Sequence, residues 1–104
     1  MSTIDPITRD VFQHQLTGIA DEMSTALRRA AYSSIIWDMW DYSVGLFAPD
    51  GDMIAQADTI PAQLGIMSTA LRYMFREFPL EVWKTGDVLV CNDPYRGCTH
   101  TMDI

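Results

Sequence analysis

Apolar residues recur every three to five positions along the first third of the chain, with polar residues between them. This spacing matches the α-helical period and predicts an amphipathic helix over residues 5–31. Asp5 and Pro6 form a favourable helix start, because Asp caps the first turn and a proline at the first helical position loses no hydrogen bond. The predicted buried side comprises Ile7, Val11, Leu16, Ile19, Met23, Leu27 and Ala30.

The pattern then changes to strands, turns and a second helix. Residues 41–47 predict a strand with Tyr42, Val44 and Leu46 on one face, and the turn at 49–52 returns the chain antiparallel over 53–57. Residues 58–63 are expected to form a loop, 64–78 a second amphipathic helix that Pro79 stops, and 88–91 a short strand. The order predicts an α+β fold: two amphipathic helices with a small antiparallel or mixed sheet.

Length and charge narrow the class of protein. A chain of 104 residues has room for one domain, and its net charge of −7 argues against nucleic acid and anionic membrane surfaces as partners. The sequence has neither an 18-residue apolar run nor a leader pattern, so a cytoplasmic protein is expected. Cys91 and Cys98 match neither a redox nor a zinc spacing and are expected to be reduced thiols.

Most of the candidate chemistry lies in the last thirteen residues. His100 and Asp103 stand three apart, so an imidazole nitrogen and a carboxylate oxygen could share a metal ion if the chain turns at Thr101 and Met102. Two ligands are too few for a complete site, and the spacing alone does not establish metal binding. Asp93 could cap a turn or serve the site, and Gly97 would allow close approach to a ligand or metal.

Two further features are weaker indications of a functional site. Residues 37–41, with two Trp and two Asp, could form an aromatic, acidic pocket mouth or simply a pair of half-buried Trp beside a strand. Cys98 as a nucleophile has only His100 as a nearby base in sequence. A phosphate-binding glycine-rich loop is absent from the sequence, so the chain is not expected to bind ATP by itself.

Collinear sequence blocks connect the chain to a known family. They include residues 5–8, 20–23, 27–33 and 41–43; Leu46, Phe47, Asp50, Gly51, Ala55 and Gln56; Ile60, Pro61, Leu64, Gly65 and Met67; residues 86–88; and finally 92–95, Gly97, Thr99, His100, Asp103 and Ile104. The chain resembles the N-terminal part of the hydantoinase B / 5-oxoprolinase B-type subunits over nearly its whole length. The resemblance implies that residues 1–104 are the N-terminal portion of a longer domain, truncated within its active site.

The resemblance also implies an activity: ATP-dependent hydrolytic ring opening of a cyclic amide such as 5-oxoproline, hydantoin or N-methylhydantoin. An A-type ATPase subunit would be the partner and the user of ATP. His100 and Asp103 would bind a divalent metal (Mn, Zn or Mg), with a third ligand, a His, beyond Ile104. Asp41 and Asp93 would orient the substrate or the ligands.

Three departures leave alternatives open. Cys98 replaces a family glycine, Gln63 stands where many members have His, and residues 37–40 replace a more polar stretch. An acetone or acetophenone carboxylase-type subunit is the alternative enzyme, and a non-catalytic truncated fragment is the other reading. The 104 residues alone are expected to be inactive.

Overall fold

Helix α1, Pro6–Ala30, leads the computed structural model, which describes residues 3–57, 59 and 61–104. The Asp5 carboxylate accepts a hydrogen bond from the Thr8 amide at 3.3 Å, which confirms the predicted start. The predicted end is also confirmed to within one residue. A short helix that the pattern did not predict, α2 at Ser34–Trp37, follows and is capped by the Ser33 hydroxyl, which accepts from the Ile35 amide at 3.3 Å.

The predicted hairpin is present. Strand β1, Gly45–Phe47, pairs antiparallel with β2, Met53–Gln56, and a bulge lies between Leu46 and Phe47. Gly51 adopts a φ of +92° in the connecting turn, a conformation that favours glycine. The first strand is shorter than the predicted 41–47, although Tyr42 and Val44 are both buried as the alternation requires.

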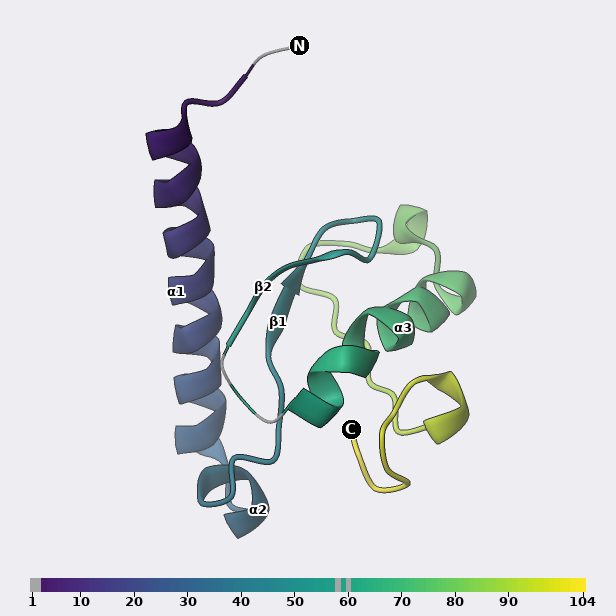
Figure 1. Ribbon diagram of the computed structural model, residues 1–104. Coiled ribbons are helices and arrows are strands. Elements are labelled where there is room, and N and C mark those ends of the chain that lie inside the picture. The colour runs from purple at the N-terminus through teal and green to yellow at the C-terminus, as the bar shows by residue number, and fades with distance from the viewer. Residues whose placement is uncertain (1–2, 58, 60) are drawn as a thin grey trace.

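The hairpin lies between α1 and α3, as Figure 1 shows, with α1 packing against β2 and α3 against β1. The core is small and consists of Ala20, Tyr42, Val44 and Ala57, with Ile36 packed against it. Its polar centre is the Tyr42 hydroxyl, which lies 2.9 Å from Ser24 Oγ and donates to the Ser24 carbonyl at 3.3 Å.

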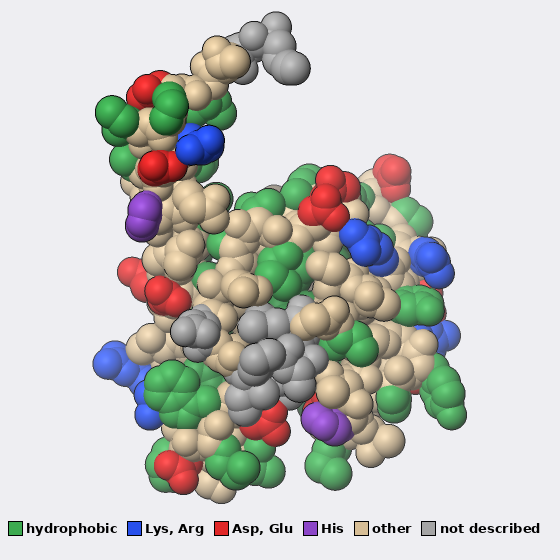
Figure 2. Space-filling view, viewed as in Figure 1, with side chains coloured by type: hydrophobic (Ala, Val, Ile, Leu, Met, Phe, Trp, Pro, Cys, Tyr) green, Lys and Arg blue, Asp and Glu red, His purple; other side chains and the backbone are tan. Residues whose placement is uncertain are grey.

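Most of the predicted buried face of α1 is wrong. Within the described residues the helix buries Ala20 and Ser24, whose small side chains permit close approach of the hairpin. Leu16 is partly buried, whereas most of the larger apolar residues remain at least 40% exposed. These exposed residues are Ile7, Val11, Ile19, Met23 and Leu27. A two-stranded sheet is too narrow to cover the wide apolar side of a helix of 25 residues. Figure 2 accordingly shows hydrophobic side chains at the surface near both ends of α1.

Helix α3, Pro61–Glu77, begins three residues earlier than predicted. Proline is compatible with the first turn of a helix, so the predicted loop over 58–63 was extended too far. Asp58 and Ile60, which belong to that loop prediction, lie outside the described residues. A 3₁₀ turn, η1 at Leu80–Val82, follows Pro79, and the Trp83 ring then packs edge-on against Phe75 with centroids 5.3 Å apart.

The predicted strand over residues 88–91 is wrong. This segment forms neither helix nor strand, and Leu89 and Cys91 are partly buried while Val88 and Val90 are exposed, so the alternation of burial is present. It pairs with neither strand of the hairpin, and the sheet has two strands among the described residues. A segment without a hydrogen-bonding neighbour does not become a strand.

The α+β class is confirmed: helices pack on a small antiparallel sheet. None of the helices over residues 3–57 and 61–104 is long and apolar enough to cross a membrane.

Candidate functional site

The loop that carries the candidate chemistry folds back against α3. A 3₁₀ turn, η2 at Pro94–Arg96, packs on this helix and ends at Gly97, whose φ is +106°. A Cβ added to Gly97 would lie 2.5 Å from Ala70 Cα and 2.7 Å from Ala70 Cβ. Gly97 therefore serves close packing against the helix backbone, and this contact, not a ligand, accounts for the glycine here.

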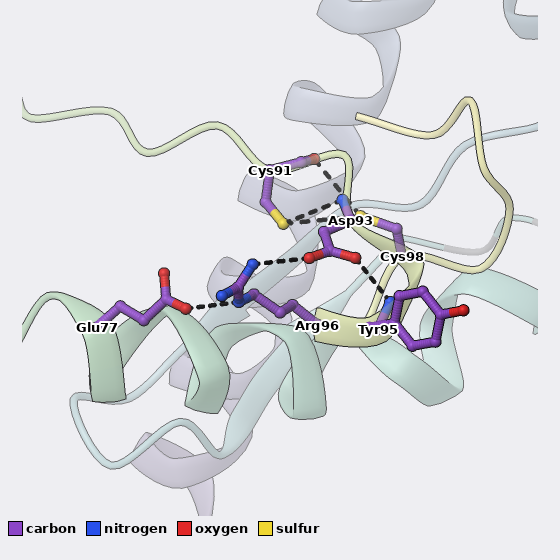
Figure 3. Close-up of polar contacts among 6 residues, drawn as sticks. All are labelled: Glu77, Cys91, Asp93, Tyr95, Arg96 and Cys98. Carbon is purple, nitrogen blue, oxygen red and sulfur yellow. Dashed lines mark hydrogen bonds and ion pairs between the residues drawn. The ribbon is translucent and has the colours of Figure 1, made fainter.

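Asp93 organises this loop. Its carboxylate accepts a hydrogen bond from the Tyr95 amide at 2.9 Å and pairs with the Arg96 guanidinium at 2.7 Å. Its backbone carbonyl accepts from the amides of Arg96 and Cys98 at 3.0 and 3.3 Å. Figure 3 shows the Asp93 carboxylate between the Arg96 guanidinium and the Tyr95 amide. The capping role considered for Asp93 is therefore the one that the structure displays.

Arg96 connects the loop to α3. Its guanidinium pairs with Glu77, the last residue of the helix, as well as with Asp93 (Figure 3). The negative charge of Glu77, followed by the hydrogen bond to Asp93, raises the pKa of Arg96 above its ordinary value. Sequence reasoning missed this link: Arg96 at three residues from Asp93 was a visible signal, whereas nothing local pointed to Glu77.

His100 and Asp103 are brought together by the turn that their cooperation requires. The Asp103 carboxylate accepts a hydrogen bond from the His100 amide at 2.8 Å, and its oxygens lie 3.2 and 3.3 Å from His100 Nδ1. The Asp103 amide in turn donates to the His100 carbonyl at 3.3 Å. With Nδ1 held by the carboxylate, the imidazole keeps Nε2 for an external partner, and the His100 side chain is 57% exposed.

This geometry fits part of a metal site. A ligating histidine commonly donates its second ring nitrogen to a carboxylate, which fixes the tautomer and raises the basicity of the ligating nitrogen. Over residues 3–57, 59 and 61–104, however, no three His, Cys, Asp or Glu side chains gather closely enough to hold a metal. The neighbouring Thr99 Oγ1 is buried without a hydrogen-bond partner within this described part. Among the described residues, the donors at His100 and Asp103 are thus fewer than a metal ion requires.

The two cysteines face each other at the base of the same loop. Their sulfurs are 4.0 Å apart, and the Cys98 thiol also lies 3.5 Å from the Cys91 carbonyl. Burial, followed by the contact with Cys91, raises the pKa of the Cys98 thiol above its ordinary value of 9.0. A thiol held protonated is a poor nucleophile, which weakens the case for Cys98 as a catalytic nucleophile.

Asp41 lies outside the loop that carries His100. It follows α2, where its amide donates to the Ile35 carbonyl at 2.9 Å, and it leads toward β1. Figure 1 shows α2 at the base of α1 and the C-terminal loop beside α3, which η2 contacts. Three of the four predicted site residues thus lie on the C-terminal loop, and the structure brings His100 and Asp103 into contact.

The tryptophans near Asp41 are half-exposed and are engaged by α1. The Arg28 guanidinium lies 4.1 Å from the centroid of the Trp40 ring, and its Nε donates to the Trp37 carbonyl at 2.9 Å. Trp40 has a φ of +60°, which is unusual for a bulky residue. A hollow of about 530 Å³ beside Trp37 is lined by Thr25, Arg28, Arg29 and Ala31. Of the two interpretations of this stretch, the structure displays the half-exposed tryptophans beside a strand.

Comparisons with known proteins extend the resemblance. A family model described as Hydantoinase B/oxoprolinase matches residues 5–104. The chain is 38% identical over 100 residues to 5-oxoprolinase 1 of Arabidopsis thaliana and 38% identical over 101 residues to 5-oxoprolinase of Saccharomyces cerevisiae. These matches cover 96% and 97% of this chain but 8% of each relative. The caprolactamase subunit beta of Pseudomonas jessenii is 35% identical over 103 residues, which are 99% of this chain and 18% of that subunit. No solved structure matches significantly.

Proposed function

Because this chain belongs to the hydantoinase B/oxoprolinase family, we propose that it contributes to an enzyme that opens a cyclic amide ring by hydrolysis at the expense of ATP. The relatives support the substrate class, since their names refer to 5-oxoproline and caprolactam, which are both cyclic amides. The substrate proposed here is 5-oxoproline, hydantoin or N-methylhydantoin. The chain spans less than a tenth of the oxoprolinases, so its share of the reaction is the contribution of this region.

The observation that carries the proposal is the His100–Asp103 pair. The carboxylate holds Nδ1 and the backbone amide of the same histidine, so the ring is oriented while Nε2 remains available. His100 would bind a divalent metal through Nε2, and Asp103 would either orient it or share the ion. A bound divalent cation polarises a carbonyl and lowers the pKa of a water toward neutrality. The remaining donors would come from outside the described residues.

The other predicted site residues receive supporting roles. Asp93 would keep the loop in place through Arg96 and Tyr95, because its carboxylate is engaged by both. Asp41 would act in orienting the substrate if the rest of the enzyme brings it toward His100. Neither residue needs to transfer a proton in this scheme.

The proposed partner is an ATPase subunit or domain of the A type. The same hundred residues make up 8% of the oxoprolinases and 18% of the caprolactamase subunit, so the oxoprolinase chains are more than twice as long. An ATPase domain that is fused to the oxoprolinase chains but forms a separate subunit in the caprolactamase would produce this difference in length.

The test is His100→Ala in the protein assembled with its ATPase partner. We expect loss of ATP-dependent 5-oxoproline hydrolysis by about two orders of magnitude or more, together with loss of bound metal measured by elemental analysis. His14→Ala is the matched control, because His14 is the other histidine of the chain and lies exposed on α1. Turnover of the His100 variant at the rate of the His14 variant would overturn the assignment.

Asp103→Asn separates orientation from ligation. An amide can still accept a hydrogen bond from Nδ1 but loses the negative charge. If Asp103 only orients His100, the variant should keep much of its metal content while its turnover falls. If metal content and turnover both fall to the levels of His100→Ala, Asp103 is assigned as a direct ligand.

A further inference from the structure

The cysteines of this chain form a pair at the point where the C-terminal loop follows residues 88–91. Cys91 precedes the loop, Cys98 follows η2, and their sulfurs stand 4.0 Å apart. Both side chains are partly buried and free. Figure 3 shows the two residues on either side of the Asp93 backbone, joined by contacts that involve their sulfurs.

The fold fixes this separation from several directions. The Asp93 amide lies 3.5 Å from Cys91 Sγ, and the Cys98 amide donates to the Asp93 carbonyl at 3.3 Å. Downstream, the close packing of Gly97 on Ala70 holds the backbone next to Cys98 against α3. The chain has therefore already lost the conformational freedom that closing an eight-residue ring from Cys91 to Cys98 would otherwise cost.

We propose that Cys91 and Cys98 form a reversible intramolecular disulfide, a modification site that ties the base of this loop. A disulfide requires the sulfurs to come within about 2 Å, so the pair must close by roughly another 2 Å, a movement within reach of side-chain rotation. The spacing of six intervening residues does not resemble a redox motif in sequence, and only the folded loop brings the two thiols together.

The oxidant is a low-molecular-weight disulfide, and the chemistry is two successive exchanges. In the first, one cysteine sulfur attacks the reagent, forms a mixed disulfide and expels one reagent thiol. In the second exchange, the other cysteine attacks the sulfur of the first cysteine in the mixed disulfide. The Cys91–Cys98 bond forms and the second reagent thiol leaves. The two cysteines together lose two electrons and two protons, and the reagent disulfide gains them as two thiols. Excess reagent thiol reverses both steps.

The experiment equilibrates the chain with glutathione buffers of increasing oxidation, quenches with acid and alkylates the free thiols. Trypsin cuts after Lys84 and after Arg96, so Cys91 and Cys98 fall in different peptides. We expect the two peptides to be joined in the oxidised samples, to separate on reduction, and to come from a monomer on a non-reducing gel. The folded chain should cross-link at an equilibrium constant about tenfold or more above that of the chain in urea.

Cys98→Ser is the matched variant, since it replaces only the sulfur atom, and it should yield no joined peptides. Cys91→Ser should behave in the same way, so the test survives if one variant fails to fold. Three results would overturn the proposal: stable glutathione adducts on both cysteines without joined peptides, joined peptides only in covalent dimers, or equal cross-linking in the folded and urea-unfolded chains.

Discussion

Replacing Gly97 by alanine tests how the candidate loop is held on α3. The substitution adds one methyl group where the chain has a φ of +106° and where that methyl would lie 2.5 Å from Ala70 Cα, 2.7 Å from Ala70 Cβ and 2.8 Å from the Ala70 nitrogen. Ala70 Cα and nitrogen belong to the helix backbone and Cβ is bonded directly to it, so none of the three can move aside as the end of a flexible side chain can. We therefore expect either loss of stability or detachment of the loop.

The size of the effect has two parts. A left-handed conformation costs a non-glycine residue about 1–2 kcal/mol, and inserting a methyl group into a packed contact costs about 1–3 kcal/mol more. Gly86 provides the matched control, because its φ is +94° and an added Cβ would meet no atom within 4 Å. Gly86→Ala thus carries the conformational cost alone, and the difference between the two variants, about 1–3 kcal/mol, measures the contact with Ala70.

The assay combines urea unfolding with hydrogen exchange resolved along the sequence. Gly97→Ala should lower the free energy of unfolding more than Gly86→Ala, or it should leave the core intact and raise exchange selectively in η2 and at Cys98. The second outcome arises if the loop detaches at a lower free-energy cost than the clash itself. Equal stabilities and unchanged exchange in the two variants would refute the close packing of Gly97 on α3.

Two further predictions concern the core and the thiols. Tyr42→Phe removes the hydroxyl that contacts Ser24 Oγ and the Ser24 carbonyl, which leaves buried polar groups without this partner. The free energy of unfolding, measured by urea titration, should therefore fall by about 1–3 kcal/mol. An unchanged stability would contradict the buried hydrogen bonds. Burial raises the pKa of Cys98 above 9.0, so the folded chain keeps the thiol proton at pH values where the unfolded chain loses it. This contribution to stability is fully present below pH 9.0 and is lost as the pH rises toward the folded pKa, so the wild-type protein should lose stability at alkaline pH more steeply than Cys98→Ser.

Local patterns predicted the elements of this fold better than their packing. The cap at Asp5, the turn at Gly51 and the stop at Pro79 depend on backbone chemistry within a few residues, and the structure has all three. The buried side of α1 depends on the partner instead. Spacing alone selected the large apolar residues, whereas the narrow hairpin packs on the small ones at Ala20 and Ser24.

The strand expected at 88–91 failed for the same reason. Its alternation is real, since Leu89 and Cys91 turn inward while Val88 and Val90 are exposed. A strand also needs a hydrogen-bonding neighbour, which no local pattern supplies. The expectation was thus correct about which side chains face inward and wrong about the sheet.

The candidate site shows the same division between local and distant contacts. The pairing of His100 with Asp103 needs only the turn at Thr101 and Met102, so a spacing of three residues was enough to suggest it. The position of that pair on the molecule depends on Gly97 meeting Ala70 and on Arg96 meeting Glu77, and both contacts span about twenty residues or more. A glycine suited to ligand approach and one suited to helix approach look identical in sequence. The contact with Ala70 decides between them, and it makes Gly97 a residue that positions the loop on which His100 is presented.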